Sequence, residues 1–186
     1  MRDELWERLR RILVEKSYER RRVILTSGRE SDFYVDGKQT SLHPEGAYLI
    51  GVLILRQLNS REPRVQAVGG MTLGADPIVS AVAVVSHLEG TPLPAFIIRK
   101  EPKGHGTGQW IEGKKNLPPR ASVAILEDVV TTGGTTLKAV ERAEQEGLRV
   151  VRILALVDRE EGGAEAIARA GFQLEAIFRR SDLEMR

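Results

Sequence analysis

One stretch, residues 122–136, constrains the fold of this chain more than any other. Its sequence is Ser-Val-Ala-Ile-Leu-Glu-Asp-Val-Val-Thr-Thr-Gly-Gly-Thr-Thr. The apolar run at residues 123–126 is typical of a parallel strand that is covered on both faces. After the glycines, apolar residues recur at helical spacing until Gly147, which predicts a helix that ends there. A buried strand that leads through a short loop into a helix indicates an α/β fold with a parallel sheet.

The loop after this strand has the composition of a site for a phosphorylated sugar. Glu127 and Asp128 follow the apolar run, and residues 131–136 are threonines and glycines. Backbone N–H groups of such a loop can point at a phosphate, whose charge the helix dipole favours. The two carboxylates would repel a phosphate but accept hydrogen bonds from ribose hydroxyls. Because neighbouring strand residues point to opposite faces, both acids can serve one ligand only if the strand ends near Leu126, at the carboxyl edge of the sheet.

Two common phosphate-binding motifs do not fit this stretch. A Walker A loop requires Gly-Lys-Ser or Gly-Lys-Thr, and a dinucleotide fingerprint requires Gly-x-Gly-x-x-Gly; residues 131–136 contain neither. A polar turn between a strand and a helix, without any ligand, is the simplest alternative. The acidic pair that precedes the glycines favours the sugar phosphate site over this alternative.

The rest of the chain continues the alternation of strands and helices. This alternation predicts one domain over residues 1–186, with a central parallel β-sheet flanked by helices on both faces. About residues 1–40 hold an amphipathic helix and short extended segments, which we expect to form a small N-terminal hood. The other strands are expected at residues 65–68, 95–98, 150–157 and 173–178, and the other helices at about 44–58, 76–88 and 164–170.

The composition limits the other classes to which the chain can belong. With 186 residues, of which 41% are apolar, the chain can form one domain with a full core. The lack of cysteine excludes a disulfide framework and thiolate metal sites and suits a cytoplasmic protein. No apolar run approaches the roughly 18 residues of a membrane span, and residues 1–16 are too charged for a signal peptide. A net charge of +2 without a basic stripe argues against a nucleic acid partner.

A cationic, glycine-rich segment at residues 99–109, the lid segment, is a second candidate site. It holds Arg99, Lys100, Lys103 and His105, with glycines at positions 104, 106 and 108. One interpretation is a charged surface loop. The other is a lid whose cations close over a strongly anionic substrate and exclude water.

Three further segments could complete a site at the same edge of the sheet. Residues 69–74, Gly-Gly-Met-Thr-Leu-Gly, form either a tight turn or a cradle for pyrophosphate. Arg159 follows the strand at 150–157, and its guanidinium can bind a carboxylate with two hydrogen bonds. Residues 27–29, with Phe33 and Tyr34, could form a wall over an acceptor base or could be a structural hairpin.

Four motifs of this chain resemble those of the orotate phosphoribosyltransferases. Residues 127–135 are similar to the phosphoribosyl pyrophosphate (PRPP) signature of the type I phosphoribosyltransferases. The narrower resemblance rests on residues 99–106 of the lid segment together with the Ser-Gly-Arg motif in residues 26–36, Thr-Ser-Gly-Arg-Glu-Ser-Asp-Phe-Tyr-Val-Asp. Residues 157–162, Val-Asp-Arg-Glu-Glu-Gly, are the fourth motif. It covers nearly the whole chain and implies the type I phosphoribosyltransferase fold.

This resemblance implies a reaction and an assembly. The 5-phosphoribosyl group would pass from PRPP to orotate, giving orotidine 5′-phosphate and pyrophosphate in pyrimidine biosynthesis. Mg²⁺ would be held mainly by PRPP, with no direct protein ligand. The chain would form a homodimer in which Lys103 and His105 act in the site of the neighbouring subunit.

The resemblance also implies roles for individual residues. Lys103, His105 and Asp128 would be catalytic, and Thr131 and Arg159 would bind orotate. The residues implied to bind PRPP are Arg99, Lys100, Lys103, His105, Glu127, Asp128, Val129, Val130, Thr131, Thr132, Gly133, Gly134 and Thr135.

One position departs from the pattern of the family, and two alternative functions stay open. Many members carry lysine before Ser-Gly-Arg, where this chain has Thr26, so either Lys38 takes over part of that role or the contact is missing. The PRPP signature alone would also fit an enzyme that acts on a purine or on uracil. A third possibility is a non-catalytic regulator of the same fold that senses PRPP and binds nucleic acid.

Overall fold

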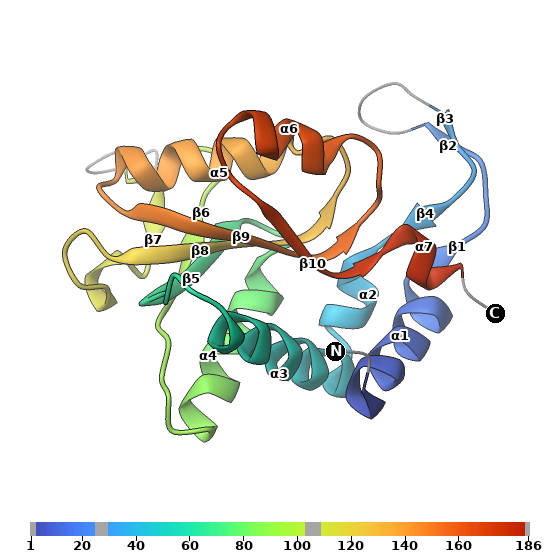
Figure 1. Ribbon diagram of the computed structural model, residues 1–186, viewed down its shortest axis with the longest axis horizontal. Coiled ribbons are helices and arrows are strands. Elements are labelled where there is room, and N and C mark those ends of the chain that lie inside the picture. Colours follow the sequence, from blue (N-terminus) through green and yellow to red (C-terminus); the bar gives the residue numbers. More distant parts are fainter. Residues whose placement is uncertain (1–2, 25–29, 103–108, 185–186) are drawn as a thin grey trace.

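The computed structural model describes residues 3–24, 30–102 and 109–184 of the chain. Within these residues, six strands form one sheet in the order β10-β9-β8-β5-β6-β7 (Figure 1). All neighbours in this sheet pair in parallel except β7, which runs antiparallel to β6 at the edge. The strands are β5 (Ala67–Met71), β6 (Ala95–Ile98), β7 (Ile111–Glu112), β8 (Ser122–Val130), β9 (Arg149–Asp158) and β10 (Leu174–Arg179).

Helices cover both faces of the sheet, as the alternating pattern predicts (Figure 1). On β8, Ala124 and Leu126 pack in the core cluster with α3 and α4, whereas Val123 and Ile125 pack in the cluster with α5 and α6. This two-residue alternation is that of a strand buried on both sides. The four helices are α3 (Pro44–Ser60), α4 (Asp76–Leu88), α5 (Gly134–Gln145) and α6 (Gly163–Arg169).

The N-terminal part of the chain packs on the main domain and shares its core. Trp6 donates from its ring nitrogen to the Ile177 carbonyl at 3.0 Å and packs on Phe178 in a tilted arrangement with ring centroids 4.8 Å apart. The β1–β4 pair and the β2–β3 pair are antiparallel and lie outside the main sheet. The elements of this part are α1 (Glu4–Lys16), β1 (Tyr18–Glu19), β2 (Val23–Ile24), β3 (Glu30–Ser31), β4 (Tyr34–Val35) and α2 (Gly37–Ser41).

Two predicted boundaries at the carboxyl edge of the sheet are wrong. The central strand does not end near Leu126 but continues to Val130, because its backbone stays paired with β9 as far as Asp158. Residues 69–71, expected in a glycine-rich loop, belong to β5 and pair with β6. The glycines fit there because β5 is crowded on both faces: a Cβ on Gly69 would collide with the ring of Phe96, and one on Gly70 with the Leu126 carbonyl.

Two short elements complete the chain. A single 3₁₀ turn, η1 (Lys114–Asn116), follows β7, and helix α7 (Arg180–Leu183) follows β10 and packs against α1. Among the residues that the structure describes, no helix combines the length and the apolar character needed to cross a membrane.

A buried ion pair ties the end of α3 to the sheet. Arg152 on β9 donates to Glu175 on β10 through Nε and Nη2, both at 2.7 Å. The same guanidinium donates to the Leu58 and Gln57 carbonyls at 2.8 and 3.1 Å, so it also caps the last turn of α3. Burial alone would raise the pKa of Glu175, but hydrogen bonds from Arg152 and Gln57 outweigh it and lower the pKa below its ordinary value.

We predict that Glu175→Ala lowers the free energy of unfolding by about 3–5 kcal/mol at pH 7, because it leaves Arg152 as a buried charge without its partner. In the wild type, the contribution of Glu175 is present above its unfolded pKa of 4.5 and is lost as the pH falls through the lower folded value. Urea denaturation at pH 7 and pH 4 measures both effects.

The control for this prediction is Glu15→Ala, since the Glu15 side chain is 73% exposed and pairs with Lys16 on the surface. Its effect should stay below about 1 kcal/mol. Equal losses in the two variants would contradict the role given to the buried pair.

Candidate active site

The predicted site residues of β8 and β9 meet at the carboxyl edge of the sheet. β8 ends at Val130, whose carbonyl accepts a hydrogen bond from the Arg159 amide at 3.0 Å. The loops that begin with Thr131 and Arg159 therefore leave the sheet side by side. Sheets of this type bind their ligands at this edge.

Glu127 and Asp128 lie inside β8, and their side chains contact each other although a strand directs neighbours to opposite faces. Glu127 is only 5% exposed, and its Oε2 is 3.4 Å from the hydroxyl of Thr136 on α5. Burial, and then the charge of Asp128, raise the pKa of Glu127 to about 8. Glu127 is therefore protonated at neutral pH and can donate a hydrogen bond as well as accept one, which differs from the expected pair of carboxylates.

Two glycines leave room for the Asp128 side chain. A Cβ on Gly74, in the β5–α4 loop, would collide with the Asp128 carboxylate, and one on Gly37, the first residue of α2, would lie 3.2 Å from the Asp128 Cβ. The Asp128 carboxylate also accepts from the Val129 amide at 2.9 Å. Asp128 is thus approached by two other segments, the β5–α4 loop and α2, but keeps partial exposure at the edge of the sheet.

Lys38 lies beside this acidic pair. Its Nζ is 2.7 Å from Oδ1 of Asp36, and the hydrogen bond to Asp36, followed by the charges of Asp128 and Asp36, raises the pKa of Lys38 in spite of its partial burial. The structure therefore places a lysine charge near Asp128. Thr26, the position where the family motif has lysine, lies outside the described residues.

The segment after β8 forms an open helix N-terminus. Gly133 has a left-handed backbone with φ of 81° and is the N-cap of α5, so no side chain occupies the first amides of the helix. Thr132, Gly134 and Thr135 are exposed, whereas Val130 is buried. This geometry suits an anion, which the helix dipole attracts.

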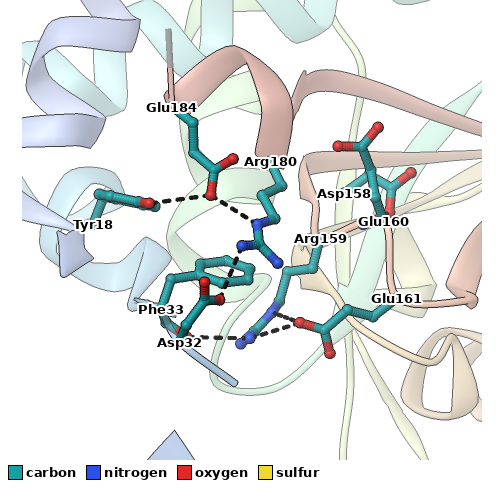
Figure 2. A network of polar contacts seen from close by, with 9 residues as sticks. All are labelled: Tyr18, Asp32, Phe33, Asp158, Arg159, Glu160, Glu161, Arg180 and Glu184. Atoms are coloured by element: carbon teal, nitrogen blue, oxygen red, sulfur yellow. Dashed lines mark hydrogen bonds and ion pairs between the residues drawn. The ribbon is translucent and has the colours of Figure 1, made fainter. Parts of the chain in front are cut away.

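Arg159 is the centre of a polar network between the hood and the sheet (Figure 2). The residue is 3% exposed, and its Nε and Nη2 donate to one oxygen of Glu161 at 3.1 and 2.9 Å. Its guanidinium lies 4.3 Å from the centre of the Phe33 ring, and Nη2 is 3.4 Å from the Phe33 carbonyl. The structure thus brings together Phe33 of the hood and Arg159, the residue just after β9, with Glu161 as an added partner.

Helix α7 contributes a residue that the sequence reasoning missed. The guanidinium of Arg180 lies 4.0 Å from the centre of the Phe33 ring and donates to Asp32 and Glu184, both at 2.9 Å (Figure 2). Arg180 therefore holds the hood segment beside Arg159. No local sequence pattern predicts this contact, because Arg180 and Phe33 are almost 150 positions apart in the chain.

The ends of the lid segment are described, but its middle is not. Arg99 and Lys100 line a cleft of about 340 Å³ together with Thr72 of the β5–α4 loop and Glu112 of β7. Nη1 of Arg99 is 3.1 Å from Oε1 of Glu112. Lys103 and His105 lie outside the described residues.

Asp128 offers a partly exposed carboxylate at this edge of the sheet. The part of the chain that the structure describes has no group of three or more His, Cys, Asp and Glu side chains that could hold a metal ion. Mg²⁺ is commonly bound through one or two carboxylates together with substrate phosphates, and the partly exposed carboxylate of Asp128 fits that pattern.

Comparison with known proteins shows the family to which this chain belongs. Residues 74–178, more than half of the chain, match the model of the phosphoribosyl transferase domain. An orotate phosphoribosyltransferase of Sorangium cellulosum is 53% identical over 176 residues, which cover 95% of this chain and 91% of that protein. The chain belongs to the orotate phosphoribosyltransferase family.

Solved structures of orotate phosphoribosyltransferases share the whole architecture. The Mycobacterium tuberculosis orotate phosphoribosyltransferase in complex with Fe(III) dicitrate is 37% identical with a TM-score of 0.82, and the alignment covers 97% of this chain and 99% of that one. The same enzyme in complex with PRPP gives 35% identity, a TM-score of 0.79 and the same coverage. The predicted fold class and the predicted class of enzyme, a pentosyltransferase, are confirmed by this family membership.

The burial of Glu127 leads to a testable prediction about its protonation. We predict that Glu127 titrates at about pH 8 in the free protein. In Asp128→Asn, the pKa of Glu127 should fall but stay above 4.5, since burial is the larger cause and remains. Carboxyl ¹³C NMR measures both values, with Glu127→Gln to assign the resonance.

The sign of the effect on stability follows from the raised pKa. The folded chain holds the Glu127 proton more tightly than the unfolded chain, so this contribution is fully present below pH 4.5 and is lost as the pH rises through about 8. A Glu127 resonance that titrates near pH 4.5 in the wild type would contradict this account of the site.

Proposed function

We propose that this chain transfers the 5-phosphoribosyl group from PRPP to orotate, giving orotidine 5′-phosphate and pyrophosphate, as a step of pyrimidine biosynthesis. The observation that carries the proposal is the acidic pair at the end of β8, which stands next to the open N-terminus of α5. These two features match the two parts of a ribose 5-phosphate. Membership of the orotate phosphoribosyltransferase family supports the choice of substrates.

In this proposal, PRPP spans the carboxyl edge of the sheet. Residues 131–135 bind the 5′-phosphate through the amides at the start of α5. Asp128 accepts hydrogen bonds from the ribose hydroxyls, and protonated Glu127 can donate or accept beside it. Val129 and Val130 hold these groups in position, while Arg99 and Lys100, at the cleft on the other side of β5, bind the pyrophosphate.

Orotate binds between the hood and the sheet. Its carboxylate takes a hydrogen-bonding position on Arg159 like the one that Glu161 fills in the free protein. Thr131, at the start of the loop next to Arg159, contacts the base. A buried guanidinium beside an aromatic ring favours an acidic, planar acceptor over a neutral one.

The reaction needs stabilisation of charge and no protein nucleophile. Cleavage of the bond to pyrophosphate gives the anomeric carbon oxocarbenium character while negative charge grows on the leaving group. Arg99, Lys100, Lys103 and His105 stabilise that charge from fixed positions, and Asp128 faces the developing positive charge of the sugar. Mg²⁺, when bound with PRPP, supplies further neutralisation of the phosphates.

We further propose that the chain acts as a cytoplasmic homodimer in which Lys103 and His105 serve the site of the partner subunit. Apolar exposure supports the dimer. Among the side chains that the structure describes, all large hydrophobic ones that are more than half exposed lie on α3, α4 or the connections just before these helices, and such exposure is typical of an interaction surface. They are Leu42 (71%), Tyr48 (54%), Leu73 (69%), Val84 (61%) and Leu88 (74%).

The activity is tested by orotate consumption with PRPP and Mg²⁺. We expect turnover with orotate and none with adenine, hypoxanthine or uracil. Lys103→Ala should lower the turnover number by roughly 10²–10³, the range for loss of one fixed group that stabilises charge. Turnover with a purine or with uracil but not with orotate would overturn the assignment, and salt-sensitive binding of DNA or RNA without turnover would favour a regulator.

Mixing two inactive variants tests whether the site is shared between subunits. Lys103→Ala and Asp128→Asn damage different parts of the site, so a hybrid dimer would contain one intact site and one with both defects. Random pairing of subunits should restore activity to about a quarter of the wild-type level. Mixing that restores no activity, while subunit exchange is confirmed, would show that Lys103 acts within its own subunit.

A further inference from the structure

Arg142 on α5 contacts the backbone of two residues that are proposed to bind pyrophosphate. Its Nη1 donates to the Arg99 carbonyl at 2.6 Å, and its Nη2 donates to the Lys100 carbonyl at 3.0 Å. Nη1 also lies 3.3 Å from the sulfur of Met71 at the end of β5. One guanidinium therefore joins helix α5 to the ends of two strands.

The same guanidinium packs on Trp110, the residue just after the lid segment. The Arg142 Cζ lies 4.1 Å from the centre of the Trp110 ring, within the range of a cation–π interaction. The Trp110 carbonyl in turn accepts from the Arg99 amide at 2.9 Å. Arg142, Trp110 and the Arg99–Lys100 backbone thus form one closed set of contacts at the base of the segment.

The chemistry of this set requires arginine. A planar guanidinium can direct two N–H groups to two neighbouring carbonyls while its face lies on an aromatic ring. A lysine ammonium keeps the charge, but it lacks the paired N–H donors of a guanidinium and the planar surface that packs on an aromatic ring. Because the bonds go to backbone carbonyls, Arg142 itself does not occupy the side chains of Arg99 and Lys100.

The position of Arg142 along α5 links two ends of one substrate. The helix starts at Gly134, and Arg142 lies eight residues later, about 12 Å along the helix axis at about 1.5 Å per residue. In the proposed function, the start of α5 binds the 5′-phosphate, whereas Arg99 and Lys100 bind the pyrophosphate. A rigid helix between these two points fixes their separation.

We propose that Arg142 is a positioning residue for pyrophosphate recognition: it holds Arg99 and Lys100 at a fixed distance from the phosphate loop at the start of α5. It touches no substrate and acts through the backbone that it binds. This inference rests on the proposed function, because it takes Arg99 and Lys100 as ligands of PRPP.

The inference predicts selective loss of binding at one end of the substrate. Arg142→Lys and Arg142→Gln should each raise the KM for PRPP and the dissociation constant for PRPP on the order of tenfold, since each loses charge-assisted hydrogen bonds to backbone carbonyls. The KM for orotate should stay unchanged. Ribose 5-phosphate, which lacks the pyrophosphate, should bind all variants as tightly as the wild type in calorimetry.

Two further measurements separate positioning from charge and from general damage. Lys138→Gln removes one positive charge from an exposed position on the same helix and should leave PRPP binding unchanged. In a Trp6→Phe background, Trp110 is the one remaining tryptophan. Its fluorescence should change in both Arg142 variants without any ligand, because the cation on its ring is lost or moved.

Different results would overturn the role of Arg142, the proposed function, or both. Wild-type PRPP binding in Arg142→Lys would show that charge alone matters and would overturn the inference. Equal weakening of ribose 5-phosphate and PRPP would overturn it as well, because the damage would then be general. A wild type that binds PRPP but does not turn over orotate would refute the proposed function only, since the binding measurements still decide the role of Arg142. A wild type that binds no PRPP would refute both.

Discussion

Two adjacent carboxyl groups share the end of one buried strand, and the surrounding structure is arranged to permit this. Glu127 is almost fully buried, so it keeps its proton up to about pH 8. Asp128 keeps partial exposure and lies within the influence of the Lys38 charge. The segments that approach Asp128 do so with glycine, at positions 37 and 74, because a larger residue would collide with it or crowd it. The space that the Asp128 side chain occupies therefore explains why glycines stand at positions 37 and 74.

Several positively charged side chains at the proposed site form ion pairs with carboxylates of the same chain. Nearly buried Arg159 is neutralised by Glu161, and a buried charge without a partner would be costly. In the proposed function, an anionic substrate would compete with an internal carboxylate when it binds, and the internal ion pair would form again when the substrate leaves. The pairs of this kind at the edge of the sheet are Arg99–Glu112, Arg159–Glu161 and Lys38–Asp36.

The sequence predicts the sheet well, because its strands leave local signals, and the proposed place of the site rests on signals of the same local kind. Apolar runs mark each parallel strand, and the acidic pair with its glycines marks the edge where β8 leads to α5. The end of β8 was misplaced, since pairing with β9 keeps a strand extended through polar residues that look like a loop. Lys103 and His105 stay predictions, because the structure does not describe their segment.

Contacts between distant segments could not be predicted from the sequence. Arg180 meets Phe33, and Arg142 meets Trp110, through folding that brings remote elements together. Neither arginine belongs to a periodic pattern or to a motif, so each looks like an ordinary surface residue. Both contacts support groups that are proposed to bind substrate, which shows how much of a site is built by residues outside its motifs.

The most direct test of this account is a crystal structure of the chain with PRPP and Mg²⁺. The account predicts the 5′-phosphate at the amides of residues 131–135, the ribose hydroxyls at Glu127 and Asp128, and the pyrophosphate beside Arg99 and Lys100. A complex with the pyrophosphate at the start of α5 and the 5′-phosphate at the β5–α4 loop, or with PRPP bound away from this edge, would contradict it.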